Sequence, residues 1–502
     1  MGVKKMNKIE KQFKKDFEKQ KHVELSFDNA QLEENTKFTR HEFNPRHKKL
    51  IITFSIVGTV VTLVAVPALI VLSSLIRVAD AVKLTKREYS MNEIKLIESN
   101  TFKKLNDIDY PSEASPTRSD ISSECQEAYS NFSNNIYHSL VDASKNDNMS
   151  CSLVGVYSVL NELYGAASTS ELKSDLDSLL GTSENTRKTF YQQLMNANSY
   201  AVDKSTIQLK NSAFFTNNLD YSSQYVDYLA ALYCEAYQLD FSKDADKIVQ
   251  WVNQAVNSND YINEDYLEVN NETVLYLLST LYFKNAWSKK YLSKDNIEDD
   301  FHLSNGETVT ATFMKHSYMA DCYYDYDSYI SVKDFYHNGY ASITYLVPKS
   351  VDYNIFELTK NKNIFIEDEE HIVSAADLQG PLTVNLKTPK FSLTTDVDFK
   401  SCLTHLGFKD IFDSNIDSFK NAFTGPKIDQ YNFYVQTFKQ RNEVTFNEDG
   451  TTVKALTLAA NGKTLSASFN NLSVDLNQPF IYIIKDFNDE PIFVGHVDNP
   501  SA

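Results

Sequence analysis

The side chains best suited to catalysis in this chain of 502 residues are its ten histidines and five cysteines. The histidines are dispersed, and the chain contains no Gly-x-Ser-x-Gly, no His-Glu-x-x-His and no Gly-rich phosphate loop. No two cysteines have Cys-x-x-Cys spacing, which argues against a zinc site or a disulfide framework. The cysteines are Cys125, Cys151, Cys234, Cys322 and Cys402. We therefore expect no enzyme activity, no metal and no cofactor.

One stretch near the C-terminus has an unusual order of elements. A run with strand alternation ends at Asn447, a Glu-Asp-Gly corner follows, and small and β-branched residues continue to Ala460. If residues 451–458 are extended, alternate side chains lie on opposite faces. One face then carries Thr451, Val453, Ala455 and Thr457, and the other carries Thr452, Lys454, Leu456 and Leu458. The pattern alone is also compatible with an ordinary surface loop.

Residues 448–451, Glu-Asp-Gly-Thr, resemble the hinge of the reactive loop in the serpin family. The C-terminus agrees, because residues 478–486 and 491–500 resemble the family's Pro-Phe strand and its Phe-x-Gly-x-Val-x-Asn-Pro ending. Val453, Lys454 and Leu456 depart from the small residues that the family favours. The predicted hinge residues are Glu448, Asp449, Gly450, Thr451, Thr452, Val453, Ala455 and Thr457.

Further motifs follow in the family's order over about three quarters of the chain. They include a buried helix ending at 165–166, a Trp-Val-Asn helix at 251–253, Tyr-Phe-Lys-Asn-Ala-Trp at 282–287 and Thr-Pro-Lys-Phe at 388–391. Asn-Gly at 305–306 independently predicts a hairpin. The resemblance implies an α+β domain over 125–502, with three β-sheets, about eight or nine helices and an exposed reactive loop.

The chain departs from the family beneath the sheet that opens. By spacing, a hydrogen-bonded Asn–His pair of the family maps to Ser279 and Gln440, and we predict that these two side chains hydrogen-bond each other instead. The family's Ser-Pro-x-Ser is replaced at Ser152 to Gly155. The predicted sheet-opening residues are Ser279, Gln440, Ser152 and Trp287.

The resemblance implies a suicide-substrate inhibitor whose partner is a serine or cysteine protease. The protease would cut the loop, and the cut loop would insert as a strand into the main sheet. Two ways of counting the spacing give different bonds, after about Thr464 or near Ser468. The candidate cleavage-site residues are Lys463, Thr464, Leu465, Ser468 and Phe469. The alternative is a non-inhibitory binding or structural protein with the same fold.

The N-terminal quarter predicts attachment to a membrane. The stretch from Leu50 to Ile76 has no charged residue and is long enough to span a bilayer. Basic residues on its N-terminal side favour a cytoplasmic tail over 1–49 and an extracellular domain, joined by a polar linker over 77–124. The alternative is a secreted protein whose signal segment is removed near Asp80.

The overall charge limits the partners further. The net charge is −18 at neutral pH, so binding to nucleic acid through a basic surface is not expected. We expect a monomer that meets its target protease at the cell surface.

Overall fold

The computed structural model describes residues 94–111, 116, 118–144, 147–451 and 470–501. The chain divides into two compact units, Met1–Val82 and Lys83–Ala502, and all described residues belong to the second. Within these described ranges, no helix combines the length and the apolar composition needed to cross a bilayer. The predicted tail over 1–49 and the predicted membrane segment over 50–76 lie outside the described residues.

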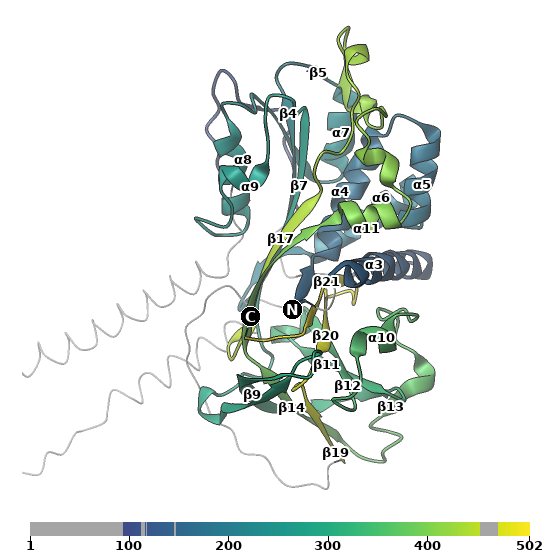
Figure 1. Cartoon of the computed structure of the whole chain (residues 1–502), viewed down its shortest axis with the longest axis vertical. Helices are drawn as coiled ribbons and strands as arrows, with labels where there is room; N and C mark the ends of the chain where they lie inside the picture. Colours follow the sequence, from purple (N-terminus) through teal and green to yellow (C-terminus); the bar gives the residue numbers. More distant parts are fainter. Residues whose placement is uncertain (1–93, 112–115, 117, 145–146, 452–469, 502) are drawn as a thin grey trace, which may run out of the picture. The chain divides into compact units, whose positions relative to one another are not determined.

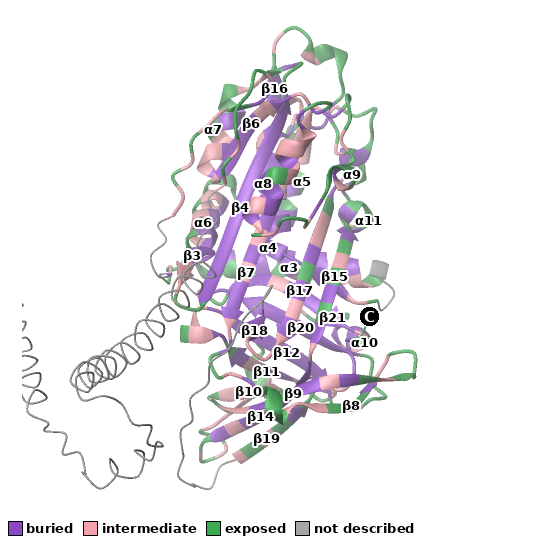
Figure 2. Ribbon diagram, turned by 90° about the vertical axis from the view of Figure 1, so that its left-hand side faces the viewer, coloured by how far each residue is buried: buried purple, intermediate pink, exposed green. Residues whose placement is uncertain are grey.

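The largest sheet has eight strands in the order β1-β6-β4-β7-β18-β17-β15, with β3 paired to β4. Its central strand β4 is buried along its whole length, which explains its run of apolar and small polar residues (Figure 2). The strands are β1 (Lys103–Lys104), β3 (Ser199–Val202), β4 (Ser205–Thr216), β6 (Cys234–Leu239), β7 (Leu275–Ala286), β15 (Phe391–Asp398), β17 (Lys439–Asn447) and β18 (Gly450–Thr451).

Helices cover both faces of this sheet (Figure 1). Helix α4 packs on β7 from one side, and α8 packs on β7 and β4 from the other. The described residues contain nine α-helices, within the predicted number: α3 (Ser123–Ser144), α4 (Leu153–Ala166), α5 (Ser170–Leu180), α6 (Glu184–Ala197), α7 (Ser223–Ala231), α8 (Ala245–Ala255), α9 (Glu264–Leu267), α10 (Ile355–Thr359) and α11 (Phe399–His405).

Three smaller sheets complete the described fold, one more than the two that we expected beside the large sheet. The seven-stranded sheet contains β2 (Met149–Cys151), β10 (Cys322–Asp325), β11 (Tyr329–Phe335), β12 (Ser342–Pro348), β13 (Ile372–Ser374), β20 (Phe480–Lys485) and β21 (Pro491–Val497). The four-stranded sheet contains β8 (Ile297–His302), β9 (Thr308–Ala320), β14 (Leu382–Pro389) and β19 (Asn470–Asp475). The additional sheet is the two-stranded pair β5 (Asp220–Tyr221) and β16 (Phe423–Thr424).

Several local predictions are confirmed. The Asn-Gly hairpin joins β8 to β9, and the buried helix ends at Ala166 as its sequence predicts. The next helix begins after Thr169, whose side chain accepts a hydrogen bond from the Leu172 amide at 3.1 Å. Local capping and hairpin chemistry therefore fix the ends of these elements.

Part of the segment predicted as a linker is packed on the domain. β1 pairs antiparallel with β6 at the edge of the large sheet, and Phe102 beside it is 1% exposed. Ile94, Leu96 and Phe102 pack into a second apolar cluster that also contains Trp251 of α8. The mostly polar composition of residues 77–124 masked these few apolar residues in the sequence. Their burial and the pairing of β1 show that residues 94–111 pack at the edge of the large sheet.

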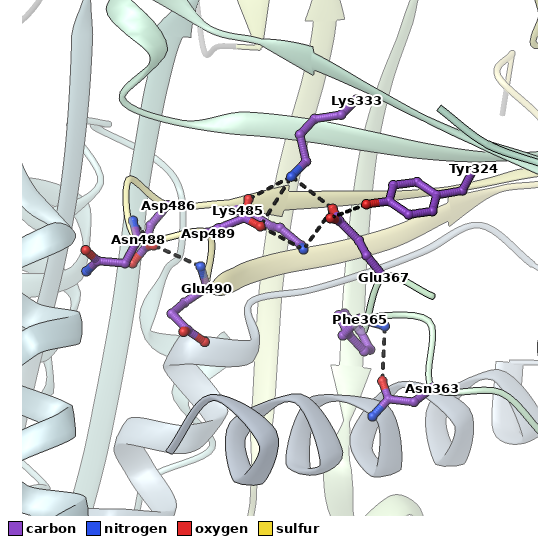
Figure 3. Close-up of polar contacts among 10 residues, drawn as sticks. All are labelled: Tyr324, Lys333, Asn363, Phe365, Glu367, Lys485, Asp486, Asn488, Asp489 and Glu490. Carbon is purple, nitrogen blue, oxygen red and sulfur yellow. Dashed lines mark hydrogen bonds and ion pairs between the residues drawn. The ribbon is translucent and has the colours of Figure 1, made fainter. Parts of the chain in front are cut away.

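The turn between β20 and β21 carries a cluster of charged groups (Figure 3). Lys333 lies between Glu367 and Asp489, at 2.9 and 3.0 Å. Asp486 is 3% exposed and Glu490 is 2% exposed. Burial raises the pKa of Asp486 to about 7 and that of Glu490 to about 8, and for Glu490 the neighbouring Asp486 adds to the effect. Both carboxyls therefore titrate near neutral pH.

Candidate functional site

The large sheet is open between β7 and β17. In the described part of the chain, β7 pairs only with β4 and β18, and β17 pairs only with β15 and β18. β7 and β17 both run antiparallel to β18, so they run parallel to each other. A cavity of about 610 Å³ separates them, lined along its sides by residues 274–283 and 435–445. The opening is one strand wide where β18 lies in it.

β18 is a strand of only two residues, and it occupies one end of this groove (Figure 2). Thr451 lies opposite Asn285 on β7 and opposite Phe446 on β17. Gly450 has a φ of +156°, and a Cβ built on it would lie 2.0 Å from the Asn285 carbonyl oxygen. Only glycine allows the chain to enter the sheet so closely at this point.

Two acidic residues of the predicted hinge are held by basic and polar side chains beside the groove. Lys390 Nζ lies 3.1 Å from Glu448 Oε1, and Asn296 Nδ2 donates to the same oxygen at 2.6 Å. Lys290 Nζ lies 2.5 Å from Asp449 Oδ1. Burial alone would raise the pKa of Glu448, but hydrogen bonds, including those from Asn296 and Lys390, outweigh it and lower this pKa. The contacts with Asn296 and Lys390 therefore favour the ionised form of Glu448.

Below the hinge, an aromatic stack contacts Thr451 directly. The Thr451 hydroxyl shares a hydrogen bond of 2.7 Å with Tyr336 Oη, and the Tyr336 ring stacks on the Trp287 ring with 4.9 Å between their centroids. Trp287 Nε1 donates to the Asn447 carbonyl at 2.8 Å, and the Trp287 amide donates to the Asp449 carbonyl at 3.2 Å. Trp287, predicted from the sequence, is thus brought to the hinge.

The predicted hydrogen bond between Ser279 and Gln440 is wrong. Gln440 Oε1 accepts from the Ser152 amide at 2.7 Å, and Gln440 Nε2 donates to the Ser152 carbonyl at 3.2 Å. The Ser279 hydroxyl is buried and has no hydrogen-bond partner in the described structure. The reason is that the groove separates the two strands on which these side chains lie.

Glycine at position 155 makes room for the longer side chain of Gln440. A Cβ on Gly155 would lie 3.1 Å from Gln440 Nε2 and 3.2 Å from Ser152 Oγ, closer than ordinary contact. Ser152 is also the N-cap of α4, since its hydroxyl accepts from the Gly155 amide at 3.3 Å. The changes at 155 and 440 therefore belong to one local arrangement that joins α4 to β17.

The remaining predicted loop residues lie outside the described residues. These are Thr452, Val453, Ala455 and Thr457 of the hinge and Lys463, Thr464, Leu465, Ser468 and Phe469 of the candidate cleavage site.

Sequence reasoning missed Tyr336, Lys290 and Asn296. No local pattern marks them, because they reach the hinge from segments more than 100 residues away along the chain. Lys390 was visible in the Thr-Pro-Lys-Phe motif and Glu448 in the predicted hinge, but the sequence did not indicate that the two are in contact.

Comparisons with known proteins agree on one family. Residues 127–500 match the family model described as Serpin (serine protease inhibitor). The chain is 25% identical over 382 residues to Alpha-1-antiproteinase of Bos taurus, covering 74% of this chain and 87% of that protein. It is 22% identical over 376 residues to a serine protease inhibitor of Cyanea capillata, covering 73% of this chain and 96% of that protein.

Solved structures show the same fold. The native state of Tengpin, a thermophilic serpin, matches with a TM-score of 0.64 at 21% identity, covering 79% of this chain and 99% of that one. Arabidopsis AtSerpin1 in its native stressed conformation matches with a TM-score of 0.62 at 20% identity, covering 76% of this chain and all of that one.

Proposed function

The chain belongs to the serpin family of serine protease inhibitors, and from this premise we propose that it inhibits a serine protease as a suicide substrate. The protease attacks a peptide bond between Lys463 and Phe469 with its own nucleophile and becomes acylated by the loop. The severed loop then enters the groove between β7 and β17 as a new strand and carries the acyl-enzyme with it. This chain supplies the bait and the groove, while the protease supplies the catalytic groups.

The observation that carries the proposal is a strand-wide groove already entered at one end by Gly450 and Thr451. Continuing the antiparallel register from Thr451 places Thr457 opposite Ser279 on β7 and opposite Gln440 on β17. The unpartnered Ser279 hydroxyl would then gain Thr457 as a neighbour that can hydrogen-bond. Insertion would therefore satisfy a buried polar group that the described structure leaves without a partner.

The two faces of the loop suit the two sides of the groove. Thr451, Val453, Ala455 and Thr457 fall on the core face, where small and β-branched side chains fit above α4. On the outer face, the register places Lys454 opposite Glu443, a pairing of opposite charges. Lys454 thus favours the inserted register, although it departs from the family's preference for small residues.

The loop is long enough to carry a protease away from the hinge. Thr464 lies sixteen positions after Glu448, and an extended chain of that length reaches about 50 Å. A protease acylated near Thr464 would be moved towards the far end of β7. We propose that contact there distorts its active site before the acyl bond is hydrolysed.

A panel of trypsin-, chymotrypsin-, elastase- and subtilisin-like proteases tests the function. We expect one class to form a complex that survives boiling in detergent, and mass spectrometry should place the acylated residue between Lys463 and Phe469. A protein that is only cleaved, with no such complex under any condition, would contradict the proposal and favour a binding role.

We further propose that the stretch from Leu50 to Ile76 anchors the protein in the plasma membrane with the inhibitory domain outside. The full chain should then sediment with membranes and resist extraction at high pH, whereas a chain lacking residues 1–76 should not. A mature N-terminus near Asp80 would instead show that this stretch is a removed signal.

A further inference from the structure

The segment between α8 and β7 crosses the outer side of the groove. It includes α9, and Tyr261, Tyr266 and Glu268 on it all line the cavity. The segment is fixed to the end of α8, since the Ile262 amide donates to Asn253 Oδ1 at 3.1 Å and Asn253 Nδ2 donates back to the Ile262 carbonyl at 3.2 Å. The segment therefore approaches β17 from the β7 side and is held in place by its hydrogen bonds to α8.

Tyr261 reaches across to β17. Its hydroxyl donates a hydrogen bond to the backbone carbonyl of Arg441. Carbonyls at even spacing along a strand point to the same side, and the Asn447 carbonyl, six residues further on, accepts from Trp287 at the end of β7. The Arg441 carbonyl accordingly points to the groove. Burial raises the pKa of Tyr261, so the phenol keeps the proton that it donates.

A second contact joins the same segment to β17, but it is weaker. Glu268 Oε1 lies 2.6 Å from Lys439 Nζ, with side chains 50% and 33% exposed. Ion pairs as exposed as this one contribute little, because solvent screens the two charges. The Arg441 guanidinium lies 5.9 Å from the ring centroids of both Tyr261 and Tyr266, close to the outer limit for cation–π attraction. The hydrogen bond from Tyr261 is thus the main link between this segment and β17.

We infer that this hydrogen bond is a latch that competes with loop insertion and must open before the loop passes Ala455. In the register fixed by Thr451, Leu456 comes to lie opposite Arg441, so an inserting strand would offer its own amide to the carbonyl that Tyr261 now occupies. The latch leaves the first four residues after Thr451 free to enter. This inference rests on the proposed function, because it requires that the groove accepts the loop.

A synthetic peptide with the sequence of residues 451–461 tests the latch without any protease. Its rate of association with the full-length protein is followed by fluorescence anisotropy, with a scrambled peptide as the control for sequence. Tyr261→Phe removes the donor and keeps the ring, so we expect association about fivefold faster than in the wild type. Glu268→Gln should change the rate by less than about twofold. Tyr353→Phe, at an exposed tyrosine, is the matched control and should leave the rate unchanged.

The outcomes separate the latch from the proposed function. Peptide binding at the same rate in wild type and Tyr261→Phe would overturn the latch while leaving insertion intact. Failure of every variant to bind the peptide would overturn insertion, and the latch with it. If Tyr261→Phe lowers the melting temperature, Asn253→Ala provides a second test. It removes the contacts that fix the segment to α8 without changing Tyr261, and it should also accelerate binding.

Discussion

Substitution of Gly450 by alanine is the sharpest perturbation of the hinge. The Cβ would lie 2.0 Å from the Asn285 carbonyl oxygen and 2.8 Å from Ala286 Cα, whereas real Cβ atoms essentially never come within 3.0 Å of another heavy atom. Both neighbours are backbone of β7, which is paired with β4 along the whole sheet. β7 cannot yield without breaking that ladder, so the hinge must leave the sheet.

The cost can be bounded from the contacts that would be lost. β18 is two residues long, and each of its hydrogen bonds contributes about 0.5–1.5 kcal/mol net. The Tyr336 hydroxyl, which contacts Thr451, would also lose its buried partner. Leaving the sheet should therefore cost about 2 kcal/mol, a reduction of roughly thirtyfold in the population with β18 formed. The same clash recurs in the fully inserted strand, because the register is continuous.

Two measurements follow the consequence. Hydrogen exchange of the peptides covering 447–451 and 283–287 should show faster exchange in Gly450→Ala. Incubation with the target protease should give mostly cleaved protein and little detergent-stable complex. Gly380→Ala is the matched control, because a Cβ there meets only the Asn470 side chain at 3.4 Å.

The reasoning fails if Gly450→Ala keeps the exchange protection of its hinge and the wild-type yield of complex. Loss of protection with an unchanged yield would be more specific. It would show that β18 forms in the uncut protein but does not contribute to inhibition.

Three further predictions concern the body of the domain. Gly155→Ala should lower the melting temperature, because its Cβ crowds Gln440 Nε2, and a shorter residue at 440 should restore part of the loss. Glu490 and Asp486 have folded pKa values above their unfolded ones, so their contribution to stability should be lost as pH rises from about 4 to about 8, whereas His496, with a folded pKa of about 4, contributes in the opposite direction at the acidic end. In urea unfolding, Glu490→Gln should therefore lose less stability than the wild type over this range, and parallel curves would exclude Glu490. Phe102→Ala should lower the free energy of unfolding by about 3–5 kcal/mol if the segment 94–111 belongs to the domain. An unchanged unfolding midpoint would indicate that this segment is a linker instead.

Local chemistry explains which parts of the fold could be predicted. The cap at Thr169 and the Asn-Gly hairpin depend on residues within four positions of each other, so the sequence carries their full signal. The corner at Gly450 is also local, because its backbone conformation excludes other residues. The width of the groove is not local. It depends on how two strands that lie more than 150 residues apart are held, and no pattern within either strand records it.

The error at Ser279 and Gln440 has a definite cause. Position in the family's order identified two residues that line the groove but not their partners, because a pairing across an opening depends on the state of the sheet. Gln440 hydrogen-bonds the backbone of Ser152 instead, and the absence of a side chain at Gly155 leaves room for it to do so. A substitution to glycine looks like a simple loss in the sequence, and only the structure shows which neighbour uses the space.

The open groove also determines how the cut protein should behave. Each inserted residue adds about two backbone hydrogen bonds at about 1 kcal/mol each, against about 1.5 kcal/mol for ordering it. These terms nearly offset each other, so burial of the core-facing side chains and the satisfaction of Ser279 decide the sign. Both favour insertion, and nicking at Lys463 with trypsin should therefore raise the melting temperature. An equal or lower melting temperature after nicking would mean that the groove does not receive the loop, and the bait and the sheet would then have to be considered as unrelated features.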